Sequence, residues 1–384
     1  MNKKLLTLAI AGVLVPFALP VTAMAGVTVS GYAHVSVDSL NSGTTTNGQS
    51  YGGSYLSSNA SNLVISGDTD LGGGLKALFS AQTFLSLGSA NTNAFSDTFS
   101  NGNTYAGLEG SFGTVAGGRN DSPMKQLGRA VDLFGNEIGD SRNIISGPGY
   151  DNFDLRPGHT LFYVSPDLGG VTVKAAYTME NSATNALNKG PLNSPLGETL
   201  ISPNPGLAGA GKGSATSVSA VYDQGPLLAG LAYEYHSASI YGTSNAESAM
   251  RAAASFNFDP VRVTALYQHD SNILGVSSSS LNVWGLGVAY TFIPDYAVKA
   301  QYYGAAKVGG TNNTGAHMVA VGLTHTFSKN ASAYLDYAKT YNQTSADYGV
   351  SSFYAGHGNA ALPTGVAGTG ADPYGVSLGM IYTF

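Results

Sequence analysis

Ten charged side chains fall within residues 121–157. Six are acidic and four are basic: Asp121, Asp132, Glu137, Asp140, Asp151 and Asp154 against Lys125, Arg129, Arg142 and Arg156. Fixed charges that border water act on passing ions, and rings of acidic side chains favour cations. The excess of acids in this segment therefore predicts a site with a weak preference for cations.

A hydrolytic site is the alternative from another class of protein. A triad of Ser, His and Asp could be drawn from His236 or His269 with Asp270 or Asp336. Acyl chemistry needs a nucleophile, a base and an orienting acid within hydrogen-bond reach, and no nucleophile elbow or fixed spacing enforces that contact here. We therefore expect that the protein is not an enzyme and has no catalytic residues.

Metal and phosphate chemistry is equally poorly supported. His317 and His325 share one face of an alternating segment, but eight residues place them roughly 26 Å apart, too far to bind one ion. Residues 206–213 resemble a phosphate-binding loop until Gly213, which stands where Ser or Thr is required. The sequence contains no Cys. We expect neither a metal nor a cofactor.

The elements that must position these charges are short segments in which apolar and polar residues alternate with a period of two. Each has about the length that a tilted strand needs to cross a bilayer. From 261 to 268, for example, Val, Val, Ala and Tyr alternate with Arg, Thr, Leu and Gln. Sixteen such segments lie near 27–38, 61–70, 74–86, 102–111, 113–120, 158–165, 170–180, 213–223, 227–238, 248–259, 261–271, 280–293, 295–306, 315–328, 331–343 and 373–384.

Short and long connections alternate along the chain. The short ones contain Gly, Pro, Asp or Asn, as tight turns require. The long ones lie near 39–60, 87–101, 121–157, 181–212, 239–247, 272–279, 307–314 and 344–372. This asymmetry is typical of a bacterial outer-membrane barrel, which has short turns on its periplasmic rim and long extracellular loops.

Both ends of the chain favour export to such a membrane. Lys3 and Lys4 precede an apolar run, and Ala23-Met24-Ala25 matches a cleavage pattern, so residues 1–25 are expected to be a signal peptide. The mature chain would then carry 15 Lys and Arg against 23 Asp and Glu, which argues against a nucleic-acid partner. The last segment, 373–384, alternates strictly and ends in Phe.

These patterns together predict an all-β protein, a transmembrane antiparallel β-barrel of sixteen strands. The sheet must close because an open edge in hydrocarbon would leave backbone groups unpaired, at a cost of several kcal/mol each. A barrel of sixteen strands cannot fill its lumen with side chains, so water enters it.

Several segments carry a family resemblance. Residues 66–77 (SGDTDLGGGLKA) and 105–119 (YAGLEGSFGTVAGGR) resemble strands of the Gram-negative general porins of the beta-proteobacterial type, and 163–166 and 381–384 extend the likeness. The resemblance implies one barrel domain over 26–384, assembled as a homotrimer in the outer membrane of a Gram-negative bacterium. Each barrel would be an aqueous pore narrowed by the third long loop, 121–157, folded into the pore.

The resemblance also suggests which charges face the pore. Arg119 matches the family position at the end of the fifth strand, and 132–135 matches the tip of the constriction loop. The family often carries Ser-Arg where this chain has Ser61-Asn62. The expected constriction residues are Arg119, Asp132, Glu137, Asp140 and Arg156. By alternation, the expected pore-lining bases are Lys76, Lys174, Arg262 and Lys299.

The function expected from the sequence is passive diffusion of ions and small hydrophilic solutes, with weak cation selectivity. Outer-membrane lipid and lipopolysaccharide would surround the barrel. A solute-specific channel is one alternative, although the inward Tyr32, Tyr303 and Tyr334 are scattered along the chain. A structural or adhesive barrel is another, although its long loops are rich in Gly, Ser, Asn and Ala.

Overall fold

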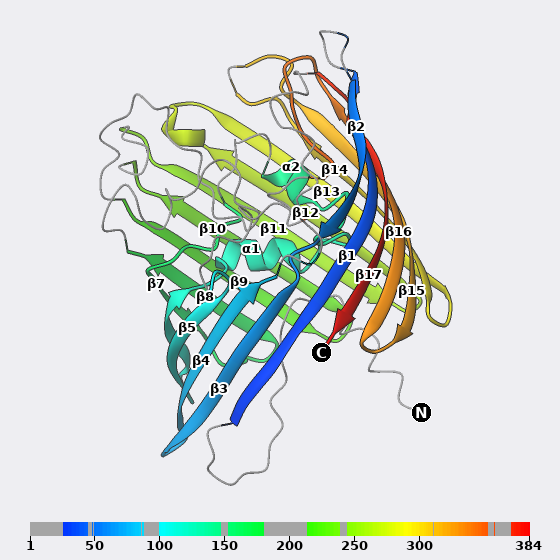
Figure 1. The fold of residues 1–384 in the computed structure, drawn as a ribbon. Coiled ribbons are helices and arrows are strands. Elements are labelled where there is room, and N and C mark those ends of the chain that lie inside the picture. Colours follow the sequence, from blue (N-terminus) through cyan, green and yellow to red (C-terminus); the bar gives the residue numbers. More distant parts are fainter. Residues whose placement is uncertain are drawn as a thin grey trace.

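The chain forms one closed antiparallel sheet (Figure 1). The computed structural model describes residues 26–44, 48, 50–85, 87, 100–146, 153–179, 213–238, 244–309, 311–351, 357 and 370–384. The expected signal peptide, 1–25, and the phosphate-loop-like residues 206–212 lie outside these residues. The first strand pairs with the last, Tyr32 lying opposite Thr383, so the sheet closes on itself.

The strands follow one another around the wall in sequence order. Their bounds are β1 Gly26–Thr44, β2 Ser50–Ser58, β3 Asn62–Gly72, β4 Leu75–Phe84, β5 Thr104–Gly110, β6 Gly113–Arg119, β7 Thr160–Val164, β8 Val171–Thr178, β9 Ala215–Gln224, β10 Leu227–His236, β11 Glu247–Phe258, β12 Val261–Ser271, β13 Ser280–Ile293, β14 Tyr296–Ala305, β15 Ala316–Ser328, β16 Ala331–Asn342 and β17 Tyr374–Thr383. The helices are α1 Pro123–Arg129, α2 Arg142–Ile145 and the short 3₁₀ helix η3 Ile273–Gly275.

β2 and β3 occupy a single position in the wall, so the barrel has the sixteen positions predicted. Both pair with β1: Val35 lies opposite Ser58, and Tyr32 lies opposite Asn62. The strand is interrupted between them at Ala60, whose φ is 51°.

The prediction of a long loop over 39–60 is therefore wrong, because residues 39–44 and 50–58 form strands. Residues 50–58 are mostly Ser and Gly and show no apolar alternation. Pairing with β1 holds them in the sheet, since strand preference depends strongly on context.

Alternate side chains face opposite sides of the wall, as predicted. On β17, Leu378 is 60% exposed and Met380 is 46% exposed, whereas Ser377 is buried. The outer face thus carries Val, Leu, Tyr and Phe, and the inner face carries small and polar residues. This is the pattern of a wall between lipid and water.

The short turns gather at one rim and the long connections at the other, as the alternating loop lengths predicted. One long connection, residues 120–159 between β6 and β7, turns into the barrel and carries α1 and α2 (Figure 1). We call its described residues, 120–146 and 153–159, the inner loop. No helix in the described ranges is long and apolar enough to span a membrane.

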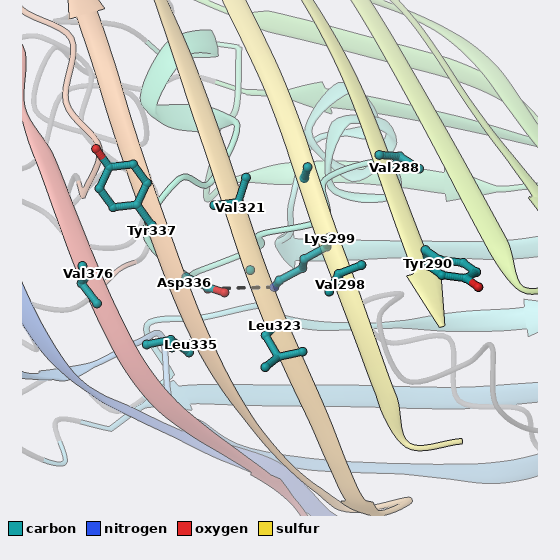
Figure 2. Close-up of a pocket in the computed structure, with 12 residues that line it drawn as sticks. Val288, Tyr290, Val298, Lys299, Val321, Leu323, Leu335, Asp336, Tyr337 and Val376 are labelled. Atoms are coloured by element: carbon teal, nitrogen blue, oxygen red, sulfur yellow. Dashed lines mark ion pairs between the residues drawn. The ribbon is translucent and has the colours of Figure 1, made fainter. Parts of the chain in front are cut away.

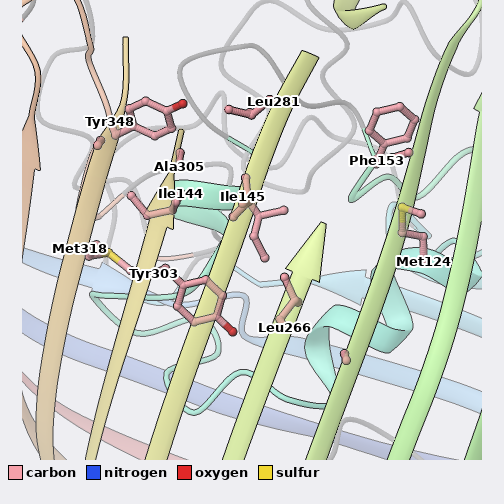
Figure 3. Packing of buried hydrophobic residues seen from close by; sticks show 14 of the residues in the cluster. Met124, Ile144, Ile145, Phe153, Leu266, Leu281, Tyr303, Ala305, Met318 and Tyr348 are labelled. Carbon is pink, nitrogen blue, oxygen red and sulfur yellow. The ribbon is translucent and has the colours of Figure 1, made fainter. Parts of the chain in front are cut away.

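Apolar contacts fix the inner loop against the wall. Met124, Leu127, Ile144, Ile145 and Phe153 of the loop are buried in one cluster with side chains of the wall (Figure 3). The wall supplies residues from β10 to β15, among them Ala232, Ala253, Leu266, Leu281, Tyr303 and Met318. The main hydrophobic core therefore lies inside the barrel, between the loop and one side of the wall.

Candidate functional site

Local structure shapes the inner loop before it reaches the wall. The hydroxyl of Ser122 accepts a hydrogen bond from the amide of Lys125 at 3.2 Å, which caps α1, and Pro123 occupies the first turn. After α1, the carboxylate of Asp132 accepts from the amides of Phe134 (3.0 Å) and Ser141 (3.2 Å). These bonds close residues 132–141 into a compact tip.

Basic side chains from β8, β12 and β14 then bond to three parts of the loop, in the order of the sequence. Lys174 on β8 donates to the side chain of Gln126 at 2.6 Å. Arg262 on β12 donates to the carbonyl of Ala130 at 2.8 Å. Lys299 on β14 donates to the carbonyl of Leu133 at 3.1 Å.

All three bases lie on the inner face of the wall. Their charged ends are occupied by the loop, on the side of the wall that the loop covers. They therefore do not lie on the opposite side of the barrel, across the lumen from the loop.

A fourth base, Arg251 on β11, is the most deeply buried of the set. It is 1% exposed and donates to the carbonyl of Met124 at 2.9 Å. Its two terminal nitrogens also bond the two oxygens of Asp154, at 2.8 and 3.3 Å. Arg251 is not among the bases that the sequence predicted to line the pore, although its place in an alternating segment marks it as inward-facing.

One charge cluster lies where the loop leaves and rejoins the wall. Asp121 pairs with Lys125 at 2.9 Å and with Arg156 at 2.9 Å. Arg156 also donates to Asn103 at 2.8 Å and lies over the ring of Phe84. Burial would raise the pKa of Asp121, but the two cations outweigh it and hold that pKa well below its ordinary value. Burial lowers the pKa of Lys125 to about 8.

A second cluster lies at the tip of the loop. Arg129 pairs with Asp140 at 2.8 Å and with Asp132 at 3.7 Å, and Arg142 pairs with Asp140 at 2.8 Å. Burial, reinforced by the neighbouring Asp140, raises the pKa of Asp132 to about 6. Burial alone would also raise the pKa of Asp140, but Arg142 and Arg129 hold it well below its ordinary value.

Glu137 belongs to a third group and does not join the tip cluster. Its carboxylate forms an ion pair with Lys299, whose amine also lies 4.0 Å from Asp336 on β16 (Figure 2). The amine sits over the ring of Phe134, 4.2 Å from its centroid. Lys299 therefore joins the loop to two strands of the wall.

The far end of the tip contacts β1 and a residue of the last long connection. The side-chain amide of Asn136 donates through Nδ2 to the hydroxyl of Tyr32 at 3.0 Å. His357 lies between the carbonyl of Asn136 (3.1 Å) and the carboxylate of Asp38 (3.0 Å). Burial lowers the pKa of His357, but Asp38 outweighs it and the pKa is raised. His357 lies in a Gly-rich and Ala-rich stretch of sequence that gave no signal of this contact.

The exposure of these side chains shows which charges meet the lumen. The side chains of Asp132 and Asp140 are fully buried, and that of Glu137 is 8% exposed. Arg129 is 27% exposed. Three of the acids expected to face the pore are therefore enclosed in ion pairs, and a base is the most exposed charge of the tip cluster.

The remaining predicted bases lie elsewhere. Lys76 is 39% exposed and pairs with Asp68 at 3.5 Å, near the rim of short turns. Arg119 ends β6, and its guanidinium lies beside Gly158 on the returning limb of the loop. Arg119 and Arg156 thus lie where the two limbs meet, apart from the tip cluster.

The candidate catalytic residues do not form a triad. The ring of His236 lies between Glu234, at 3.0 Å, and Glu247, at 3.7 Å. His269 contacts Asn282, and Asp270 accepts from Gln268. Within the described segments, no three His, Cys, Asp or Glu side chains form a group suited to a metal ion.

Comparisons with known proteins agree with this architecture. A family model described as Gram-negative porin matches residues 7–346. Outer membrane porin protein 32 of Delftia acidovorans is 26% identical over 347 residues, 87% of each chain. Major outer membrane protein P.IB of Neisseria gonorrhoeae is 31% identical over 190 residues, 48% of this chain and 51% of that protein.

Solved structures share the fold. The anion-selective porin from Comamonas acidovorans superposes with a TM-score of 0.69 at 23% identity, covering 94% of this chain and 100% of that one. OmpF of Salmonella typhi superposes with a TM-score of 0.63 at 16% identity, covering 94% and 98%. Because the family model spans most of the sequence, the chain belongs to the Gram-negative porin family, whose members are outer-membrane channels and not enzymes.

Proposed function

We propose that the protein is a general diffusion channel for ions and small hydrophilic solutes, narrowed by the inner loop. The observation that carries this proposal is the position of the loop, which lies inside the barrel and is bonded to the wall from β8 to β14. A wall of sixteen strands encloses more space than its own side chains fill. Passage then depends on the gap between the loop and the strands that face it, and it needs no cofactor or energy source.

The exposed charges support a weak preference for anions. The expectation of cation preference rested on the excess of acids in 121–157, but Asp132, Glu137 and Asp140 are buried in ion pairs. Arg129, at 27%, is the most exposed side chain of the loop's ion pairs, ahead of Asp121 at 18%, whose partners Lys125 and Arg156 are exposed by only 3% and 9%. A base as the most exposed charge of the loop favours anions, although only weakly because Asp121 partly offsets it. The similar Comamonas porin is described as anion-selective.

Planar bilayer recording tests both parts of the proposal. Mature protein should insert as large, open steps of conductance, and the reversal potential under a KCl gradient should indicate modest selectivity for chloride. Selectivity for potassium would keep the diffusion channel but reject the reading of the exposed charges. A folded barrel that conducts no current would reject the channel itself.

We further propose a homotrimer that uses the outer face of β1 to β6. Among the described residues, the exposed large apolar side chains of these strands are Val27, Val29, Val37, Leu56, Leu71, Phe79, Leu108 and Val115, with no Tyr or Trp. From β7 to β17 the outer face carries many exposed Tyr residues and Trp284. Tyr and Trp form belts where a barrel meets lipid headgroups. A face without them fits contact with other copies, while lipid and lipopolysaccharide surround the rest.

A further inference from the structure

One lysine of the wall faces outward. By the alternation of their strands, the lysines and arginines within β4, β8, β11, β12 and β14 face the lumen. Lys339 on β16 instead shares its face with the exposed Leu335, Tyr337 and Tyr341. In the described part of the chain, no carboxylate pairs with it. A cation on a surface that faces lipid is costly unless a counter-charge is at hand.

Aromatic and imidazole rings surround this lysine. Its amine lies 4.4 Å from the centroid of the Tyr341 ring. The ring of His317 stacks on Tyr341, with centroids 4.9 Å apart, and on Tyr302, with centroids 5.9 Å apart. Lys339 and these three rings form a continuous outer patch, which we call the β14–β16 patch. It offers an ammonium, an imidazole and phenol hydroxyls, all of which can donate to a phosphate.

The height of the patch identifies the leaflet. Lys339 lies three residues before the end of β16, where the chain enters the long connection to β17. His317 is the second residue of β15 and follows another long connection. The long loops are on the extracellular rim, so the patch meets the headgroups of the outer leaflet.

An apolar hollow continues from the patch toward the middle of the bilayer. It has a volume of about 540 Å³, and its lipid-facing lining includes Val298, Val321, Leu335, Tyr337 and Val376 (Figure 2). Ala300, a small residue on the same outer face, leaves the space between these larger side chains. Tyr337 is two residues from Lys339 on the same face, about 7 Å along the strand.

We propose that this surface is a binding site for a phosphorylated lipid of the outer leaflet. The headgroup phosphate pairs with Lys339 and accepts hydrogen bonds from His317 and the tyrosines, and one acyl chain lies in the hollow. Charge complementarity selects an anionic headgroup, and the hollow selects a lipid over a soluble phosphate. The inference does not depend on the selectivity of the pore.

Native mass spectrometry of refolded, lipid-free protein in detergent tests the site, with diphosphoryl lipid A as the probe. Lys339→Gln should weaken retention of the probe about fivefold, since one basic residue near a membrane surface contributes about that factor. Lys329→Gln, on a short turn at the opposite rim, is the matched control and should bind as the parent does. Ala300→Leu, which fills the hollow, should also weaken retention.

Three outcomes would overturn the proposal. Equal retention by Lys339→Gln and the parent would show that the lysine does not recognise the probe. Equal retention of lipid A from which both phosphates have been removed would show that the headgroup charge is irrelevant. Loss of the oligomer in Lys339→Gln, with the monomer still folded, would assign the patch to contacts between copies instead.

Discussion

Arg251 of β11 and Asp154 of the inner loop form a bidentate ion pair. Both side chains are buried, and they are 97 residues apart in sequence. The same guanidinium bonds the carbonyl of Met124, at the start of α1. One wall residue therefore joins the outgoing limb of the loop to the returning limb. This contact fixes the distance between the two limbs of the loop at the wall.

Replacing Arg251 by Met should loosen the loop and enlarge the channel. Breaking a buried pair leaves Asp154 charged and unpaired, at a cost of about 3–5 kcal/mol. We expect higher single-channel conductance and faster uptake of larger sugars into proteoliposomes. Adding Asp154→Asn to the same chain should restore part of the stability, because no uncompensated charge remains. Unchanged conductance in the single variant would mean that the apolar contacts of α1 are sufficient.

The sequence predicted the wall better than the contacts inside it. Alternation identified the faces of nearly every strand, because each residue obeys the same rule: apolar side chains face the lipid outside the barrel, and small or polar side chains face the water inside it. It failed at 50–58, where Ser and Gly carry no such signal and pairing with β1 decides the structure. It also placed Lys299 on the inner face but could not reveal its partner Glu137, which is 162 residues away. Partners at that separation depend on how the loop folds back, which no local pattern records.

Ion selectivity should shift in opposite directions in two variants of the tip cluster. Arg129→Gln removes the most exposed charge of the cluster and should reduce the preference for anions. Replacing Asp132, Glu137 and Asp140 together by their amides removes three acids from beside Arg129, Arg142 and Lys299 and should raise the preference for anions. Reversal potentials under the same KCl gradient measure both changes. Equal selectivity in parent and triple variant would remove the loop from the account of selectivity.

Selectivity should also change with pH near the pKa of Asp132. That pKa is raised to about 6, so the carboxyl loses its charge as the pH falls from 7.5 to 5. The cluster then becomes more positive, and the preference for anions should rise. The Asp132→Asn variant should lack this part of the pH response. The raised pKa also affects the free energy of unfolding, because the folded protein binds the proton of Asp132 more tightly than the unfolded chain does. This stabilisation is complete below the ordinary Asp pKa of about 3.9 and is lost as the pH rises through 6.

The trimer face can be tested with one bulky substitution and its control. Val37 on β1 is 57% exposed and pairs with Leu56, on the face that lacks Tyr and Trp. Val37→Trp should favour monomers, because a packed contact between copies has no room for the larger ring. Leu286 on β13 is 63% exposed on the aromatic side, where lipid adapts to side-chain shape, so Leu286→Trp should stay trimeric. Electrophoresis of unheated samples separates the two results.

Gly139 controls how closely the tip approaches the wall. Its φ of 80° is unfavourable for other residues, and a Cβ there would lie 2.5 Å from the Cβ of Ala320 on β15. Its amide donates to the carbonyl of Val350, and its carbonyl accepts from Gln301, so the backbone cannot turn away without losing both bonds.

Gly139→Ala should therefore push the tip into the lumen and lower the single-channel conductance, and the backbone strain should cost about 1–2 kcal/mol. Ala320→Gly in the same chain removes the opposing methyl group and should restore conductance while leaving the strain. Thermal unfolding and conductance thus report on separate consequences of one methyl group. A Gly139→Ala channel with parental conductance would mean that the tip does not border the narrow part of the pore.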